Sequence, residues 1–267
     1  MRTNDWSHLW GYICVLAAFA LCMQACAPLS GPRENLPALD PERIWARFEQ
    51  EAALRGDVPF WLKASLNYSG PEDSHRSQFE LWGNTELPLR LDLKASLGII
   101  VSLWRIDANG WLIYVPEEKT AYTHPEAALA LQRLDFPCPL NMQDLARIFT
   151  GQAAACMPSS YTKATATTDR NIQYRFASWS RIRTLVLDSK GRISSMSGHQ
   201  PYTWSLEMDD YKKAKQAAFA RTYRLRTAQG HKAVVRIKEI RLRSAPWPKK
   251  ALSLPLPEGT ARRHLGE

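Results

Sequence analysis

The serine, histidine and cysteine side chains are the residues of this chain that could carry covalent or metal chemistry. Ser160 and Lys163 have the Ser-x-x-Lys spacing of some acyl-transfer enzymes, but none of the companion motifs of those enzymes is present. The histidines are scattered without metal-ligand spacing, and there is neither a Gly-rich phosphate loop nor a Gly-x-Ser-x-Gly elbow. We therefore expect no catalytic residue, no metal site and no cofactor, so that the protein is not an enzyme.

Cys26 is the cysteine whose surroundings favour covalent modification. Residues 9–25 carry no charge and end in small residues, which is the layout of a cleaved secretory signal; a permanent membrane span is the weaker alternative. Ala25 supplies the small side chain needed before the cut, although Met23 and Gln24 depart from the usual lipoprotein signal. We expect a signal peptide over 1–25 and acylation of Cys26. Ala27 is not the Asp of an inner-membrane retention signal, so we expect a lipid anchor in the outer membrane, with the protein facing the periplasm.

Cys138 and Cys156 are an even pair beyond the anchor, in a chain expected to enter an oxidising compartment. We expect them to form a disulfide, which would stabilise the fold by roughly 3 kcal/mol on the chain-entropy model. Two buried free thiols are the alternative.

The positive charge is concentrated near the C-terminus. The formal net charge is +9, and residues 211–250 hold 13 Lys or Arg against the single acid Glu239. A basic face could lie against anionic head groups, or it could be a solvated surface that keeps the protein soluble. Because the chain is expected to be exported, we expect no nucleic-acid partner.

Residues 26–40 are rich in proline and polar residues and are predicted to be a tether between the lipid and the fold. Asp40 and Pro41 predict the start of a helix whose apolar face, which includes Trp45 and Phe48, ends at Gly56. We expect one domain over 41–244 and an irregular, proline-containing tail over 245–267.

Most of the domain has the period of β-strands. Residues 60–68 and 87–93 alternate apolar and polar side chains, Asn109 and Gly110 form a turn signal, and the parity shifts near Lys238 and Glu239 as at a β-bulge. A second helix is predicted between Asn141 and Gly151. Further strands are expected around 79–81, 99–106, 111–115, 174–176, 182–187, 193–196, 202–208, 223–225 and 234–242. The fold class is therefore mainly β (α+β), a curved antiparallel sheet of about ten or eleven strands that forms an incomplete β-barrel lidded by a few helices.

The apolar face of such a sheet could enclose a cavity or a solid core. If it encloses a cavity, the alternation selects the residues that line it. The candidates are Leu62, Leu66, Phe79, Leu81, Leu89, Leu91, Leu93, Trp204 and Leu206.

Residues 91–151 resemble the LolB family of outer-membrane lipoproteins. The resemblance rests on Leu91-Asp92-Leu93, Ser96-Leu97-Gly98, Tyr122, Pro137-Cys138-Pro139-Leu140-Asn141, Leu145 and Ile148-Phe149-Thr150-Gly151. It implies an apolar cavity for acyl chains and, at Leu97 beside Gly98, an exposed loop residue that enters the membrane. A Leu that folds back into the core is the alternative for Leu97, and Ser96 departs from the proline of the family.

The resemblance implies that the protein, as a monomer, accepts the acyl chains of client lipoproteins from a LolA-like periplasmic carrier and inserts them into the outer membrane. The alternative is a lipid-anchored structural or assembly scaffold that binds a protein partner or another hydrophobic cargo.

Overall fold

The computed structural model of the chain describes residues 39–53, 56–126, 131, 138–214 and 217–265, which belong to one compact unit, Leu39–Glu267. The predicted signal peptide, the acylation site Cys26 and nearly all of the predicted tether lie outside the described residues.

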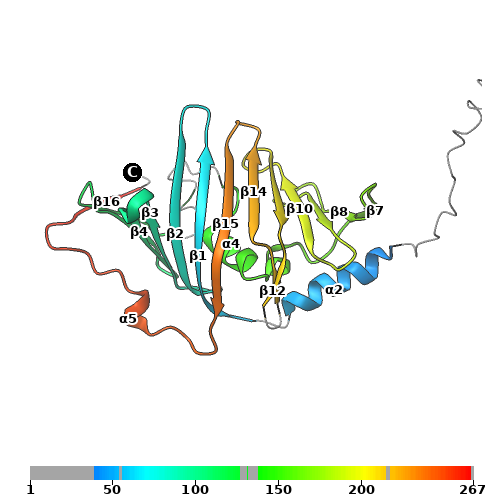
Figure 1. Ribbon diagram of the computed structural model, residues 1–267, viewed down its shortest axis with the longest axis horizontal. Helices are drawn as coiled ribbons and strands as arrows, with labels where there is room; N and C mark the ends of the chain where they lie inside the picture. The colour runs from blue at the N-terminus through cyan, green and yellow to red at the C-terminus, as the bar shows by residue number, and fades with distance from the viewer. Residues whose placement is uncertain (1–38, 54–55, 127–130, 132–137, 215–216, 266–267) are drawn as a thin grey trace, which may run out of the picture. The chain divides into compact units, whose positions relative to one another are not determined.

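A single curved sheet, mainly antiparallel and not closed into a barrel, dominates the unit (Figure 1). Within the described residues it has fourteen strands, and only β16 and β6 pair in parallel. The order across the sheet is β16 (Ala261–His264), β6 (Thr120–His124), β5 (Gly110–Val115), β4 (Ile100–Asp107), β3 (Leu89–Lys94), β2 (Ser74–Asn84), β1 (Pro59–Ser69), β15 (Lys232–Leu242), β14 (Thr222–Thr227), β11 (Trp204–Asp209), β10 (Ile193–Gly198), β9 (Thr184–Leu187), β8 (Ile172–Arg175) and β7 (Lys163–Ala166). This architecture confirms the predicted fold class.

Short strands account for the difference from the predicted number. β6, β7 and β16 were not predicted, and neither was the separate hairpin of β12 (Lys212–Ala214) and β13 (Ala217–Phe219). Each has at most five residues, which is too short for alternation to show.

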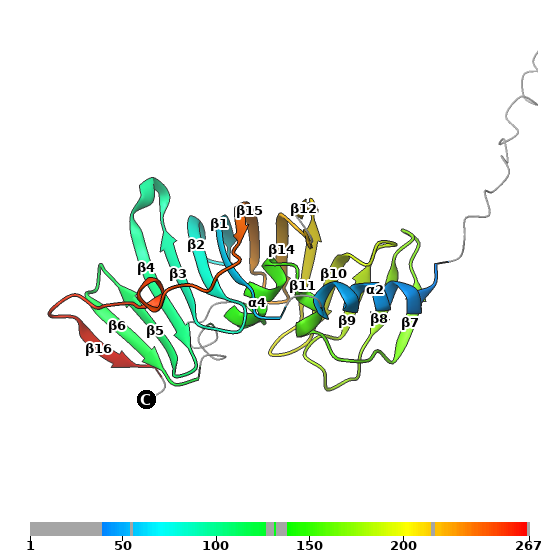
Figure 2. The same ribbon diagram turned by 90° about the horizontal axis from the view of Figure 1, so that it is seen from below.

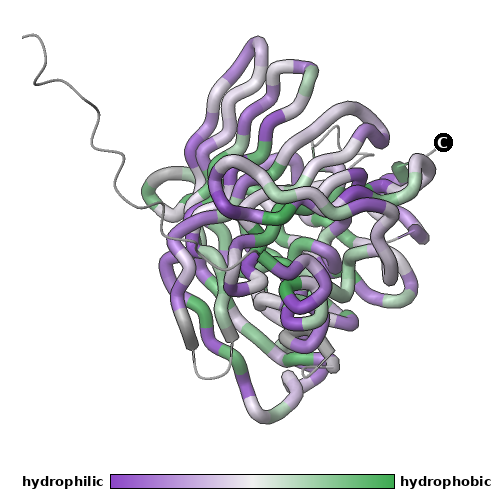
Figure 3. Tube along the Cα trace, turned by 90° about the vertical axis from the view of Figure 1, so that its right-hand side faces the viewer, coloured by the Kyte–Doolittle hydropathy of each residue, from purple (hydrophilic) through white to green (hydrophobic). Residues whose placement is uncertain are grey.

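The predicted alternation and its interruptions fix the register of the central strands. Lys63 pairs with Glu239 but Ala64 pairs with Ile237, so Lys238 is the extra residue of the predicted bulge. Asp107 pairs with Gly110 across the predicted turn, and the carboxylate of Asp107 accepts a 2.9 Å hydrogen bond from the Asn109 amide. Figure 3 shows the apolar and polar positions that alternate along the strands.

Helix α2 (Pro41–Ala53) begins as predicted, because the Asp40 carboxylate accepts a 3.1 Å hydrogen bond from the Arg43 amide. The Tyr174 hydroxyl on β8 donates to the Pro41 carbonyl, and the Trp45 ring lies 5.1 Å from the Tyr174 ring. Helix α4 (Met142–Phe149) lies within the curve of the sheet (Figure 2). The two helices therefore cover different parts of the same apolar face.

The segment after Ser244 is ordered rather than irregular, contrary to the prediction. It forms α5 (Lys249–Leu252), and then β16 pairs with the edge of β6 (Figure 2). We call residues 244–265 the C-terminal strap. Leu254 of the strap packs with Tyr114 and Ala121 in an apolar cluster separate from the main core.

Candidate functional site

An apolar cavity of about 120 Å³ lies between the sheet and α4. Strands β1 to β4, β11, β14 and β15 supply most of its wall, and α4 closes it with Met142, Leu145 and Phe149. All of its lining side chains are apolar or aromatic: Leu66, Phe79, Leu81, Leu91, Leu93, Trp104, Leu131, Cys138, Leu140, Met142, Leu145, Phe149, Leu206, Tyr223, Leu225, Ala233 and Val235. Such a cavity offers hydrocarbon a dry environment and offers a charged group no partner.

The structure places most of the predicted lining residues in this wall. Those that line the cavity are Leu66, Phe79, Leu81, Leu91, Leu93 and Leu206.

The other three predicted lining residues, Leu62, Leu89 and Trp204, are buried in the solid part of the core, with exposed fractions of 0%, 0% and 1%. The close approach of Gly198 to the Trp204 ring, and of Gly83 to the Leu89 backbone, shows how tightly their surroundings pack. Alternation predicts which face of a strand is apolar, but it does not predict where along that face the packing leaves space.

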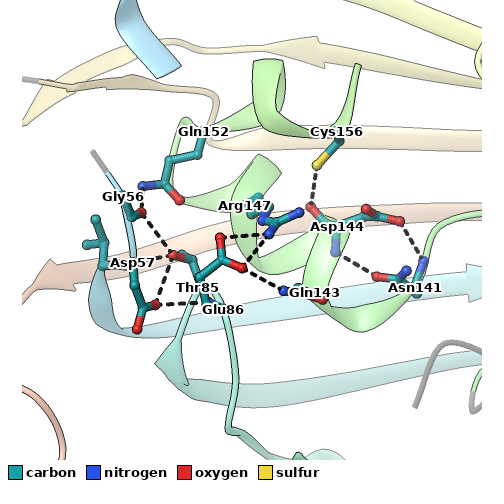
Figure 4. A network of polar contacts seen from close by, with 11 residues as sticks. Gly56, Asp57, Thr85, Glu86, Asn141, Gln143, Asp144, Arg147, Gln152 and Cys156 are labelled. Carbon is teal, nitrogen blue, oxygen red and sulfur yellow. Dashed lines mark hydrogen bonds and ion pairs between the residues drawn. The ribbon is translucent and has the colours of Figure 1, made fainter. Parts of the chain in front are cut away.

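Two ion pairs hold α4 against the cavity, and Figure 4 shows the one between Arg147 and Glu86. The Arg147 Nη2 atom donates to both carboxylate oxygens of Glu86, which follows β2, at 2.7 Å each. Gln143 Nε2 donates to the same carboxylate at 3.2 Å. On the other side, the buried Asp144 carboxylate pairs with Arg181 at 2.8 Å. The lid of the cavity is thus fixed to the β2–β3 turn and to the β8–β9 loop.

Local hydrogen bonds fix both ends of α4 as well. Asn141 and Asp144 form a reciprocal capping box at its start, as the predicted Asn141 cap requires. After its end, Gln152 Nε2 donates to the Gly56 carbonyl at 3.0 Å, beside the buried Thr85. Sequence reasoning missed Glu86, Arg147 and Arg181, because their pairing depends on segments that are distant in the chain.

Cys138 and Cys156 are free thiols, so the predicted disulfide is not present. Cys138 is buried in the cavity wall, whereas the Cys156 Sγ atom contacts the Asp144 carbonyl oxygen at 3.8 Å. Burial raises the pKa of each thiol to about 12. The two cysteines therefore act as small apolar residues around α4 and not as a covalent link.

The loop between β3 and β4 exposes apolar side chains. Its turn, η1 (Ser96–Gly98), holds Leu97 in the left-handed region at φ 68°, and the Leu97 side chain is 98% exposed. Ile99, Ile100 and Val101 follow with exposed fractions of 65%, 43% and 41%. Leu97 does not fold back into the core, which removes that alternative. The predicted loop is thus the edge of a larger exposed apolar segment, residues 97–101.

Ser160 and Lys163 are both exposed, and Lys163 lies in the edge strand β7. Across the described part of the chain, no group of three or more His, Cys, Asp or Glu side chains is arranged to hold a metal ion. In the same residues, no helix is long and apolar enough to cross a bilayer.

The chain matches no protein-family model and no curated protein sequence. Solved structures, however, share its fold. A crystal structure of a LolA superfamily protein from Nitrosomonas europaea covers 81% of this chain and 99% of its own, with 11% identity and a TM-score of 0.56. A DUF1329 family protein from Desulfovibrio piger covers 79% of this chain and 98% of its own, with 6% identity and a TM-score of 0.54. The chain therefore has a LolA-like fold.

Proposed function

We propose that this LolA-like chain is a lipid-anchored protein of the outer membrane that takes up the acyl chains of other lipoproteins and releases them into the bilayer. A LolA-like periplasmic carrier supplies the clients, and the protein acts as a monomer without a catalytic group or a cofactor. The observation that carries the proposal is the wholly apolar cavity that α4 closes.

Burial of hydrocarbon supplies the binding energy, at about 0.8 kcal/mol for each methylene removed from water. A cavity of about 120 Å³ is close in size to the engineered apolar cavity of roughly 150 Å³ that holds one benzene. The cavity therefore has room for a short stretch of hydrocarbon. A longer acyl chain enters when α4 moves outward, and this movement breaks the contacts of Arg147 with Glu86 and of Asp144 with Arg181.

The exposed segment 97–101 supports the release step. A fully exposed Leu gains about 2 kcal/mol when it enters hydrocarbon, and the three apolar residues after Gly98 add to that gain. When this segment is in contact with the bilayer, an acyl chain that leaves the cavity can enter the hydrocarbon core of the membrane. Transfer then runs downhill in affinity from carrier to receptor to membrane, and no energy source is required.

Titration of the full chain with a dansyl-labelled fatty acid tests the proposal. We expect saturable binding, and we expect Ala233→Leu to weaken it at least tenfold, since Ala233 lines the cavity and the larger side chain fills it. Ala166→Leu makes the same change at an exposed position of β7 and should leave binding unchanged.

A scaffold for a protein partner is the second candidate, because an exposed apolar segment such as 97–101 also fits a protein surface. The same titration separates the two. An absence of saturable binding would favour the scaffold over the acyl-chain carrier. Equal binding by the Ala233→Leu and Ala166→Leu variants would favour it too, because the fatty acid would then not bind in the cavity.

A further inference from the structure

One end of the apolar cavity lies near solvent. Leu66 and Leu225 in its wall are only partly buried, whereas Phe79 and Leu81, which also line it, are 6% and 0% exposed. Leu66 is nearer than either of these residues to the turn that joins β1 to β2. That turn stands beside the turn between β14 and β15 (Figure 1). The solvent-facing end of the cavity is therefore the end below these two turns.

The row of side chains at this end is partly polar. Tyr68 follows Leu66 on the same face of β1, and residues that follow one another on a face are about 7 Å apart. Tyr68 pairs with Ala233 of the cavity wall on one side and with His75 of β2 on the other. A phenol and an imidazole thus stand directly beyond the apolar wall.

Three rings are stacked in this place. The Tyr68 ring centroid lies 6.4 Å from that of His75 and 6.0 Å from that of His231, and the planes are inclined by 10° and 19°. The Tyr68 hydroxyl and His231 Nδ1 are hydrogen-bonded at 2.9 Å. His75 Nε2 hydrogen-bonds to the Asp73 carboxylate at 2.8 Å. We call Tyr68, His75 and His231 the ring cluster, and these contacts fix its geometry.

The ring cluster keeps one hydrogen-bond donor that its own contacts do not use. If Tyr68 donates to His231, the imidazole proton is on Nε2, which forms no hydrogen bond to another residue that the structure describes. If His231 instead donates from Nδ1, the Tyr68 hydroxyl keeps its proton. Either tautomer therefore leaves one donor for an acceptor outside the chain.

The charge beside the ring cluster favours a neutral acceptor. The Asp73 carboxylate is held there by His75, and it disfavours a second carboxylate at the same place. Acyl groups are carried as esters and amides, whose carbonyl oxygens are neutral acceptors. A hydrocarbon tail in the cavity and a carbonyl at the ring cluster would satisfy both parts of the site.

We propose that the ring cluster is a head-group site, in which Tyr68 or His231 donates to the ester or amide carbonyl of an acyl chain whose tail lies in the cavity. This inference rests on the proposed function and names the part of the ligand that is recognised. The apolar wall binds any hydrocarbon of suitable size, whereas the donor at its end selects an acyl group from bare hydrocarbon.

Displacement of a dansyl-labelled fatty acid from the full chain by two ligands of equal length tests the site. Methyl laurate has the carbonyl, and dodecyl methyl ether has a methylene in its place. We expect the ester to bind at least fivefold more tightly than the ether, as is usual for one hydrogen bond. Tighter binding of laurate than of methyl laurate would overturn the preference for a neutral head group.

A matched pair of double variants assigns the difference to the ring cluster. Tyr68→Phe with His231→Phe keeps the rings but removes both possible donors, so the ester and the ether should then bind equally, and binding of the ether should change less than twofold. Tyr122→Phe with His264→Phe removes the same groups from β6 and β16, and the fivefold preference should remain.

The result also separates this site from the function on which it rests. Saturable binding of both ligands with equal affinity in the parent chain would overturn the head-group site and leave the cavity as the acyl-chain site. A fivefold preference that persists without the Tyr68 and His231 donors would overturn it too. If neither ligand displaced the labelled fatty acid, the acyl-chain cavity itself would be overturned, and the head-group site with it.

Discussion

Arg147 of α4 donates through one nitrogen to both carboxylate oxygens of Glu86, at 2.7 Å each, and so fastens the lid of the apolar cavity to the turn after β2 (Figure 4). The Arg147 side chain is mostly buried, whereas that of Glu86 is half exposed. Such a pair contributes modestly to stability. In the proposed uptake of an acyl chain, however, α4 moves outward, and this movement breaks the pair.

Glu86→Gln should therefore loosen the lid more than it weakens the fold. We expect the free energy of unfolding to fall by about 0.5–1 kcal/mol and the rate of fatty-acid uptake to rise about two- to fivefold. Chemical denaturation and stopped-flow fluorescence measure the two effects. Glu207→Gln is the control, because it removes the 2.7 Å partner of Arg226 on the face of β11 and β14 that points away from α4. Equal uptake rates in both variants would mean that α4 does not gate the cavity.

Asp144 and Arg181 should be energetically coupled. Asp144→Asn removes a charge that is buried, pairs with Arg181 and completes the capping box, so we expect it to cost about 2 kcal/mol of stability. Arg181→Gln should cost less, because its side chain is more exposed. A double-mutant cycle measured by urea denaturation should give a coupling energy of about 1 kcal/mol. Strict additivity would show that the 2.8 Å pair contributes nothing.

The elements of the fold could be predicted from the sequence wherever they carry a local signal. Asp40 and Asn141 cap the predicted helices, the bulge occurs at Lys238, and the turn occurs before Gly110. Each of these depends on residues close together in the chain. The strap could not be predicted, because its four-residue strand β16 has no apolar periodicity and its partner, β6, lies about 140 residues earlier in the chain.

Only the part of the candidate site that has a local signal in the sequence could be predicted. Alternation identified Leu91 and Leu93 as wall residues, but the helical side of the cavity, including Phe149, required knowledge of where α4 lies. The disulfide prediction was wrong because sequence gives the number of cysteines and not the direction of their side chains. The pairing of Glu86 with Arg147 joins residues 61 positions apart and leaves no sequence signal.

Leu97→Glu should weaken binding to membranes without affecting the fold. The side chain is 98% exposed, so we expect a stability change within about 0.5 kcal/mol. In a Cys26→Ser background, which removes the proposed anchor, binding to phosphatidylethanolamine–phosphatidylglycerol vesicles should fall roughly 30-fold, as expected for about 2 kcal/mol. Flotation measures the binding. Ser160→Glu adds the same charge at another exposed position, and a comparable loss in that variant would attribute the effect to charge alone.

The free thiols should make the protein less stable at alkaline pH. Burial raises the pKa of Cys138 and of Cys156 from 9.0 to about 12, so each thiol stays protonated in the folded chain after it has ionised in the unfolded chain. The unfolded state then binds fewer protons, and the free energy of unfolding falls as the pH rises from about 9 to about 12.

Each thiol should account for about 2 kcal/mol of the loss between about pH 8.5 and about pH 10.5. Urea denaturation at the two pH values measures it. Cys156→Ala should reduce the difference by about that amount, whatever it costs at the lower pH, because alanine has no proton to release. A pH difference that is the same in the variant and in the parent chain would show that the Cys156 thiol does not ionise on unfolding. If Cys156 were joined to Cys138 in a disulfide, Cys156→Ala would free the Cys138 thiol and increase the pH difference instead.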